Sequence, residues 1–468
     1  MPAKPALKRA LGFRDLTLFY VVSGLSVRWV ATAAAAGPST LVVWIIALLA
    51  FFLPLAASVL QLSAVYPQEG GLYVWTQEAF GDFSGFIAAW TYWMSNLPYF
   101  PAVLYFGAAS VLFAFAHGQS LASSGIYYAT FAVIWLAIIT TLNVIGVNVG
   151  KWLNNIGSIG SIVPLIILFV LAAISASRFG SATHFSHSNI VPHITLQNAI
   201  FYSTIFFAFG GCEAGSFMGE EIKNPRRTIP RALLFGGAIL AIGYIAGTVA
   251  MLIALPGDAV GGPDGFVLGL QALCIRLGVN WLLIPLALLV GLNAVAGAAA
   301  FLSSTSRLPF VAGIDSYLPP AFGSIHPRFL TPWVAITAYG AAGMVVALLS
   351  QAGTTVRGAY NVLVSMSIIA YFLPYLLLFA TTLKLQSRPA VRNGFRIPGG
   401  RFIASVLAVI GFTSTGLTII LSVIPPEEEP HKVLAISKVL LLTLALIGAG
   451  IAVFVTAKRK QRAVFERI

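Results

Sequence analysis

Residues 201–221 read FYSTIFFAFGGCEAGSFMGEE, and this stretch decides how the chain can fold. Its first half is as apolar as a membrane-spanning helix, but the paired glycines Gly210 and Gly211 interrupt it. Glycine in a helix interior costs about 1 kcal/mol relative to alanine, so a pair of glycines favours unwinding. Glu213 follows directly, and a carboxylate within a membrane marks a functional site by default. The stretch therefore predicts a broken membrane helix that carries a site.

The whole chain has the composition of a membrane protein. Of its 468 residues, 58% are hydrophobic and only 9% are charged, and the mean hydropathy is +0.91. Soluble domains carry about 25% charged residues. Soluble enzymes, nucleic-acid-binding proteins and disordered chains are therefore excluded, and we expect an integral protein of the lipid bilayer.

Twelve apolar stretches are each long enough, at about 20 residues, to cross a membrane. They lie near residues 16–37, 40–63, 84–115, 126–146, 153–177, 196–219, 232–255, 281–310, 332–351, 360–383, 402–424 and 433–457. The connections between them are short, and they leave no room for a soluble domain. We expect an all-α integral membrane protein with twelve transmembrane helices.

The distribution of basic residues predicts the orientation of the chain. With the N-terminus inside, 21 of the 27 lysines and arginines face the cytoplasm and five face outward, which leaves Arg28 within the first stretch. This asymmetry follows the positive-inside rule. It explains the net charge of +13 as topology, so we expect no nucleic-acid partner. Both termini are predicted to be cytoplasmic, in a multi-pass protein of the cell membrane.

Arg28 and Glu213 are the two charged residues that we place in the membrane interior, since Arg307 and Lys438 are assigned to the membrane surfaces and thirteen of the 14 acidic residues to loops or tails. Ser23, Gly24 and Ser26 precede Arg28, so the first stretch is also predicted to be interrupted. The first and sixth stretches begin two five-span halves, and interrupted helices at matching positions indicate a transport site. Two alternatives stay open: the glycines allow close helix packing, or the two charges form a structural ion pair.

Four motifs carry a resemblance to a known family, and they occur in the order that the family shows. They are PQEGGLYVWTQEAFG at 67–81, EIKNPRRTIPRA at 221–232, the segment 307–319, and FRIPGG at 395–400, with Asp15-Leu16-Thr17 at the start of the first span. With these motifs, essentially the whole chain resembles the amino acid–polyamine–organocation permeases. The resemblance implies a five-plus-five inverted repeat with two additional C-terminal helices, and transport of amino acids or related amines.

The resemblance also implies how the chain is divided. We expect a cytoplasmic tail at 1–15, a first repeat of spans 1–5 at 16–195, a second repeat of spans 6–10 at 196–385, spans 11 and 12 at 386–457, and a basic cytoplasmic tail at 458–468. The sequence leaves the oligomeric state open, a homo-oligomer included.

Family knowledge assigns roles to residues at matching positions. Phe207 matches an aromatic residue that covers substrate, and Glu213 matches an acidic residue of gating and proton response. Asn96 matches an asparagine near substrate, and Phe301 matches a second gating aromatic residue. A substrate cavity is expected between spans 1, 3, 6, 8 and 10. Its substrate-binding residues are predicted to be Ser23, Gly24, Ser26, Val27, Arg28, Asn96, Phe207, Ala208, Phe209, Gly210 and Gly211.

Span three also carries several aromatic residues that we interpret mostly as packing or interfacial groups. They are Trp90, Tyr92, Trp93 and Tyr99.

Span one departs from the family pattern. The family has a Gly-Ser-Gly break whose backbone amides hold the substrate carboxylate, whereas this chain has Ser26-Val27-Arg28. Arg28 offers a forked cation that suits a carboxylate. Alternatively, Arg28 replaces a cation that relatives hold beside span eight, where the sequence offers oxygens from Ser303, Ser304 and Thr305.

A third arrangement pairs Arg28 directly with Glu213, which would then act as a structural gate. If the two residues instead lie across the cavity, a substrate carboxylate would compete for Arg28 and release Glu213 to take a proton. The two arrangements predict different responses of transport to pH.

The expected function is secondary active transport of amino acids or related amines by alternating access, as a proton symporter or a substrate exchanger. The alternative is a polyamine or organic-cation permease. A channel would need rings of like groups around a pore, and an intramembrane enzyme would need paired carboxylates, a Ser–His pair or a zinc motif. We therefore expect no enzyme, no metal site and no cofactor. The expected partners are a small amino acid or amine substrate and the bilayer.

Overall fold

The structure is a computed structural model that describes residues 7–192, 195, 198, 202, 205–260, 262–350, 356–386, 397–424 and 432–465. The start of the expected sixth span and residues 395–396 of the last motif lie outside this set. Within it the chain is helical, and the one contact of the β type is an isolated parallel bridge between Leu11 and Ile222. The expectation of an all-α protein is confirmed for the described residues.

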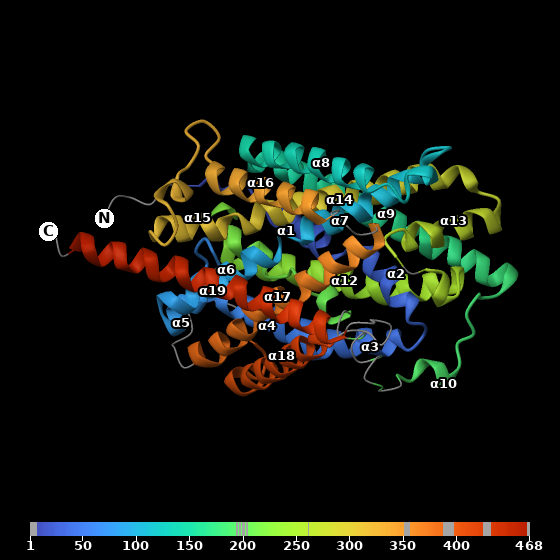
Figure 1. The fold of residues 1–468 in the computed structure, drawn as a ribbon. Coiled ribbons are helices and arrows are strands. Elements are labelled where there is room, and N and C mark those ends of the chain that lie inside the picture. Colours follow the sequence, from blue (N-terminus) through green and yellow to red (C-terminus); the bar gives the residue numbers. More distant parts are fainter. Residues whose placement is uncertain are drawn as a thin grey trace.

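The helices follow one another with short connections (Figure 1). Up to residue 192 they are α1 (Phe13–Gly24), α2 (Arg28–Ala35), α3 (Thr40–Ala47), the π-helical η1 (Leu48–Phe52), α4 (Leu53–Val65), α5 (Leu72–Phe80), α6 (Asp82–Ser95), α7 (Tyr99–Leu112), the 3₁₀ turn η2 (Gly118–Leu121), α8 (Gly125–Ile145), α9 (Val147–Phe179) and α10 (His187–Ile190).

After residue 204 the main helices are the 3₁₀ helix η3 (Ala214–Glu221), α12 (Pro225–Ala254), α13 (Gly265–Leu277), α14 (Leu283–Thr305), α15 (Arg307–Ile314), α16 (Trp333–Ser350), α17 (Val356–Leu385), α18 (Gly400–Val423) and α19 (Lys432–Phe465).

Eight segments of the described chain are long and apolar enough to cross a membrane. They are Phe13–Ala35, Thr40–Val65, Gly125–Ile145, Gly150–Phe179, Pro225–Ala254, Asn280–Gly313, Trp333–Ser350 and Gly400–Val423. These segments overlap the expected spans 1, 2, 4, 5, 7, 8, 9 and 11. The pattern is that of a multi-pass membrane protein.

Two expected elements differ in extent from the prediction. The stretch 84–115 was expected to form one long span, but α6 and α7 are separate helices. Pro98 explains this break, because proline has no N–H and disfavours helical geometry at the residue before it. Asn96 lies at the break. At the other end of the chain, α19 continues beyond residue 457 to Phe465.

The first and sixth spans are both interrupted, as the sequence predicts. In the first, α1 ends at Gly24 and α2 begins at Arg28. In the sixth, residues 205–208 are helical, residues 209–213 form turns, and η3 follows. Gly211 has a φ of +107°, a backbone conformation that residues with a side chain rarely adopt.

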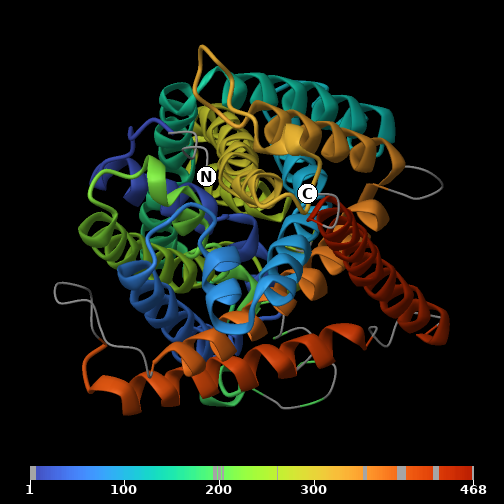
Figure 2. The same ribbon diagram turned by 90° about the vertical axis from the view of Figure 1, so that its left-hand side faces the viewer.

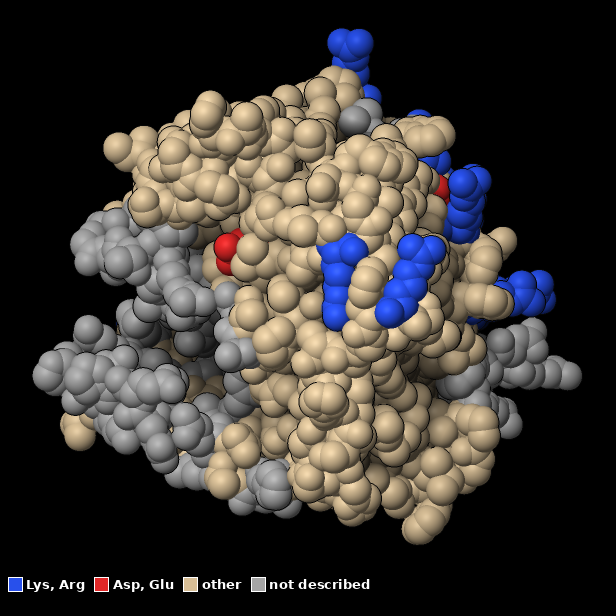
Figure 3. Space-filling view, turned by 90° about the vertical axis from the view of Figure 1, so that its right-hand side faces the viewer, with Lys and Arg blue, Asp and Glu red and all other residues tan. Residues whose placement is uncertain are grey.

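The helices form one bundle in which α14 lies in the interior, packed against α9 and α7 (Figure 2). Helix α1 packs against α12, and α17 packs against α18 and α6. Helices α18 and α19 lie at the rim of the bundle (Figure 2). The described chain begins and ends at the same end of the bundle, which we call the terminal end (Figure 1). The described surface of the opposite end is mostly uncharged (Figure 3).

Candidate functional site

A small buried cavity lies where the two broken segments meet. Its volume is about 20 Å³, which is room for one water molecule. It is lined by Ser23, Gly24, Ser26, Arg28, Trp29, Ser95, Asn96, Tyr99, Phe207, Ala208, Gly210, Phe301, Ser367 and Tyr371. These residues come from the expected spans 1, 3, 6, 8 and 10, between which the sequence analysis predicts a cavity.

Three residues that were expected to bind substrate, Val27, Phe209 and Gly211, do not line this cavity. Val27 and Phe209 are fully buried in the surrounding core. The ring of Phe209 packs edge-on against Trp44, with the ring centroids 5.3 Å apart. Five lining residues were not expected there, and Tyr99 had been interpreted as a packing group. The five are Trp29, Ser95, Tyr99, Ser367 and Tyr371.

Arg28 is the one charged side chain among the described residues that line the cavity. It is only 4% exposed, and its Nε and Nη1 atoms have no hydrogen-bond partner. The guanidinium carbon lies 4.4 Å from the ring centroid of Trp29 and 5.3 Å from that of Tyr99. Aromatic faces stabilise a cation in part, but they do not satisfy its N–H donors. The geometry therefore leaves a buried guanidinium that can receive a carboxylate.

Tyr244 of α12 ties the two broken segments together. Its hydroxyl group donates to the carbonyl oxygen of Gly24 in span one and lies 3.1 Å from the carbonyl oxygen of Ala208 in span six. The same hydroxyl accepts a hydrogen bond from the backbone N–H of Ser26 at 3.3 Å. The Tyr244 ring stacks on Trp44 with centroids 4.5 Å apart. Tyr244 therefore engages the Ser26 amide, while the side chain of Arg28 keeps unsatisfied donors at the break.

Glu213 lies in a separate buried cluster beside the cavity, and its side chain is fully buried. Its Oε1 atom accepts hydrogen bonds from the hydroxyl groups of Tyr92, of Tyr371 at 3.1 Å and of Tyr375 at 2.8 Å. Its Oε2 atom accepts from the backbone N–H of Gly211 at 3.3 Å. The direct ion pair with Arg28, one of the three arrangements left open by the sequence, is not present. Tyr92 had been interpreted as a packing residue, and its hydroxyl role was missed.

Aromatic rings close the cavity on several sides. The Phe207 ring packs edge-on against Trp29, with centroids 5.5 Å apart, and against Tyr371 at 5.1 Å. Phe301 packs against Tyr99 at 4.8 Å. These contacting rings and the small volume describe a closed cavity, and a molecule larger than water needs some of them to move.

The three residues of the alternative cation site lie outside the cavity lining. Ser304 and Thr305 donate their hydroxyl groups to the carbonyl oxygen of Phe301, at 3.3 Å and 2.5 Å. The carbonyl oxygen of Ser303 accepts a hydrogen bond from Arg307 Nη1. A hydroxyl oxygen that donates its proton can still coordinate a cation, so a cation site at the end of α14 stays a prediction.

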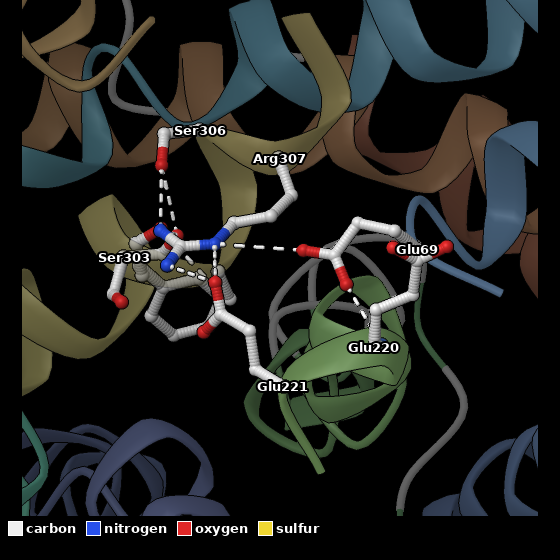
Figure 4. Close-up of polar contacts among 8 residues, drawn as sticks. Glu69, Glu220, Glu221, Ser303, Ser306 and Arg307 are labelled. Carbon is white, nitrogen blue, oxygen red and sulfur yellow. Dashed lines mark hydrogen bonds and ion pairs between the residues drawn. The ribbon is translucent and has the colours of Figure 1, made fainter. Parts of the chain in front are cut away.

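The inference that Glu213 is the only buried carboxylate is wrong. Glu69, Glu221 and Arg307 form a second buried cluster at the terminal end, and their side chains are 4%, 0% and 1% exposed (Figure 4). Arg307 donates from Nε at 3.2 Å and from Nη2 at 2.7 Å to Glu221 Oε1. Its Nε atom lies 3.7 Å from Glu69 Oε1. We call these three residues the terminal network.

The terminal network joins three of the motifs that carried the family resemblance. Glu69 belongs to the motif at 67–81, Glu221 opens the motif at 221–232, and Arg307 opens the segment 307–319. Glu69 and Glu221 lie just beyond an apolar stretch and Arg307 lies near the end of one, so the sequence analysis placed all three in loops. The available signal was the presence of both charge signs within those motifs.

The comparisons with known proteins agree with the fold. Residues 11–452 match the family model described as amino acid permease. An uncharacterized transporter of Legionella pneumophila is 29% identical, over 96% of this chain and 95% of the relative. A probable agmatine/putrescine antiporter of Lactococcus lactis is 24% identical, over 85% and 84% of the two chains. A branched-chain amino acid permease of Bacillus subtilis is 25% identical, over 84% of each. These relatives are transporters and not enzymes, and the chain belongs to the amino acid permease family of the amino acid–polyamine–organocation superfamily.

Proposed function

We propose that this permease is a secondary active transporter of amino acids, and that Arg28 receives the substrate carboxylate. The observation that carries the proposal is the buried guanidinium of Arg28, which lines the cavity with Nε and Nη1 unbonded. An unpaired buried charge is costly. A ligand that pairs with the guanidinium offsets this cost, and the binding free energy becomes more favourable. A carboxylate matches the forked geometry of the group.

The runner-up function is transport of decarboxylated amines, which the name of the Lactococcus lactis relative suggests. Such a substrate would bring one or two positive charges toward Arg28. Among the described residues that line the cavity there is no acidic side chain to offset that repulsion, since Glu213 lies behind Tyr371. The charge of the cavity therefore favours amino acids over polyamines and organic cations.

The substrate ammonium group needs polar acceptors on the other side of the cavity. Asn96 donates its Nδ2 atom to the carbonyl oxygen of Tyr92 at 2.8 Å, so its Oδ1 atom is what it can offer to an ammonium group. The remaining expected contacts, Ser23, Gly24, Ser26, Ala208 and Gly210, line the same cavity. We propose that Phe207 and Phe301 cover the substrate, and that their movement opens the cavity to one side of the membrane at a time.

For the architecture, we infer twelve transmembrane helices in a five-plus-five inverted repeat, with both termini cytoplasmic. The repeats would be 16–195 and 196–385, and 386–457 would add two spans. The inference is supported by the two interrupted spans, which begin the two halves and meet at one cavity tied by Tyr244. The excess of basic residues on the side of both termini supports the orientation.

The energy source is proposed to be proton symport or substrate exchange. Tyr371 gives a physical link, because it lines the cavity and also donates to Glu213. A substrate that moves Tyr371 changes the hydrogen bonding of Glu213, and coupling requires such a differential interaction between two states.

The test is uptake in proteoliposomes of the purified protein. Each of the twenty amino acids, together with agmatine and putrescine, is offered at low concentration, and counterflow is measured for those that enter. Saturable uptake and counterflow of at least one amino acid are expected. Uptake of the amines alone would establish the runner-up, and flux without saturation or counterflow would indicate a channel.

A further inference from the structure

The terminal network contains more negative than positive charge in a buried place. Two carboxylates, Glu69 and Glu221, lie around the single guanidinium of Arg307 (Figure 4). All three side chains are at most 4% exposed. If both carboxylates were ionised, the network would hold one uncompensated negative charge, which burial makes costly.

The hydrogen bonds show that Arg307 stabilises the negative charge of Glu69 less than that of Glu221. Arg307 uses Nε and Nη2 on Glu221, and it uses Nη1 on the Ser303 carbonyl oxygen and on Ser306 Oγ at 3.1 Å. Arg307 therefore donates no hydrogen bond to Glu69, although the two side chains form an ion pair at 3.7 Å. Glu69 Oε1 and Glu221 Oε2 are both buried without a hydrogen-bond partner, but Glu221 receives two bonds from Arg307 through Oε1 whereas Glu69 receives none from it. The Oε2 atom of Glu69 accepts one bond, from the backbone N–H of Glu220 at 3.0 Å.

Several other charged and titratable groups surround Glu69. Burial raises the pKa of the Glu69 carboxyl group well above its ordinary value, Glu221 and Glu220 add to the increase, and Arg307 opposes it. Glu78, Asp315 and Tyr73 line a surface pocket together with Glu69. On the other side of Gln68, Arg9 and Arg226 line a second pocket together with Glu220.

We propose that Glu69 binds a proton when the terminal network is closed, and that opening of the terminal end releases this proton. The segments that would separate are the Gln68–Gly70 loop, the end of η3 and the start of α15. They are held together now by the ion pairs of Arg307 and by the bond from the Gly70 N–H to the Phe217 carbonyl oxygen at 3.0 Å. In the open state water solvates Glu69, and its carboxyl group then ionises with a pKa near the ordinary value of about 4.3.

The sign of the pH dependence follows from this difference. Glu69 binds its proton more tightly when the terminal network is closed than when it is open. A low pH at the terminal end therefore stabilises the closed state. As the pH rises toward the closed-state pKa, the proton is lost and the preference for the closed state declines. One proton allows at most about a tenfold change in the opening equilibrium per pH unit. The site is thus a proton-binding site that regulates access, distinct from Glu213 beside the cavity.

A cysteine reporter tests the proposal without any substrate. Cys212 and Cys274, both buried, are replaced by alanine, and Val311→Cys is introduced. Val311 is 6% exposed and lies against Gly70, so a maleimide should label the introduced thiol when the loop leaves α15. The labelling rate in detergent is measured from about pH 5 to pH 8, the range in which a carboxyl group with a raised pKa titrates. It is divided by the rate for Ser120→Cys, an exposed position that corrects for thiol ionisation.

We expect the corrected labelling rate to rise with pH when Glu69 is present, by up to about tenfold per unit. Glu69→Gln, which imitates the protonated carboxyl group, should label slowly with no pH dependence, and Glu69→Asp should keep the dependence. Glu78→Gln, a control at an exposed neighbouring glutamate, should leave the slope unchanged. Equal slopes in the reporter protein with Glu69 intact and in its Glu69→Gln variant would overturn the proposal. A corrected labelling rate that does not change with pH in the reporter protein with Glu69 intact would also overturn the proposal. That second result needs no substitution within the terminal network.

Discussion

The side chain of Tyr371 lines the cavity that contains Arg28, while its hydroxyl group donates to Glu213 at 3.1 Å. The two charges that the sequence placed within the spans are thus connected through an aromatic side chain and not by an ion pair. On the cavity side of Tyr371, Arg28 keeps donors without a hydrogen-bond partner. On the other side of Tyr371, tyrosine hydroxyl groups donate to Glu213. This separation allows a ligand to occupy Arg28 without first breaking a salt bridge.

Replacement of Arg28 should weaken substrate binding strongly without unfolding the protein. In Arg28→Ala we expect binding to weaken roughly 10- to 100-fold, because a charge-assisted hydrogen bond is lost. Arg28→Lys should also fail, since an ammonium group lacks the fork; partial activity would favour the cation-replacement alternative. Scintillation-proximity binding measures both variants. Arg276→Ala, at an exposed arginine, is the control and should bind normally.

Phe207 should act as a cover and not only as a packing residue. We expect Phe207→Tyr and Phe207→Trp to transport, and Phe207→Ala to lose transport because the cavity no longer closes. Phe209→Ala is the matched control, since it also removes a buried ring but does not line the cavity. Each Ala variant should lower the melting temperature, because a buried ring is lost. Uptake normalised to folded protein separates the effects, and equal uptake by both Ala variants would assign Phe207 to packing.

Tyr244 should hold the two broken segments in register. Tyr244→Phe keeps the ring stacked on Trp44 and removes the hydroxyl group, which leaves the carbonyl oxygens of Gly24 and Ala208 without that donor. We expect a loss of stability of about 1–3 kcal/mol together with weaker substrate binding. Tyr127→Phe removes a hydroxyl bond to the Ala108 carbonyl oxygen outside the cavity lining, and it should affect stability alone. Thermal unfolding and binding assays are compared, and unchanged binding in Tyr244→Phe would remove Tyr244 from the site.

Glu213 should couple transport to pH through the cavity. Glu213→Gln is expected to keep substrate exchange and to lose the dependence of uptake on the pH of the side from which substrate enters. The glutamine cannot ionise; its one oxygen can still face the three tyrosine hydroxyl groups, whereas its NH2 group cannot accept the bond from the Gly211 N–H. Counterflow and net uptake are measured in parallel over the same pH range as the labelling experiment. An unchanged pH profile would exclude proton coupling through Glu213 and leave it as a gate residue.

Much of the fold follows from local sequence signals. Apolar stretch length predicted the eight segments of the described chain that are long and apolar enough to cross a membrane, and the glycines near Gly24 and Gly211 predicted the two breaks. Both properties act through the backbone close to the residue itself. The break before Pro98 follows the same local rule, but the stretch around it was treated as one helix. The family resemblance pointed to Asn96, Phe207 and Phe301, and all three line the same cavity.

The rest depends on contacts between residues distant in the chain. Tyr244 lies 36 and 220 positions from the carbonyl groups it contacts, and its sequence neighbourhood is simply apolar. The tyrosines around Glu213 look like packing residues in a chain that is 12% aromatic. Glu69 lies just outside an apolar stretch and Arg307 near the end of one, and only tertiary packing decides that such charges are buried.

Equilibrium binding of one amino acid and its carboxyl-modified forms tests the central claim most directly. The amino acid is the best substrate from the uptake screen, and its competitors are its carboxamide and its decarboxylated amine, on the unmodified protein and on Arg28→Ala. The account predicts that both competitors bind the unmodified protein at least about tenfold more weakly than the amino acid, and that Arg28→Ala loses this discrimination. Equal binding of the amine and the amino acid to the unmodified protein would contradict the role of Arg28 as the carboxylate receptor.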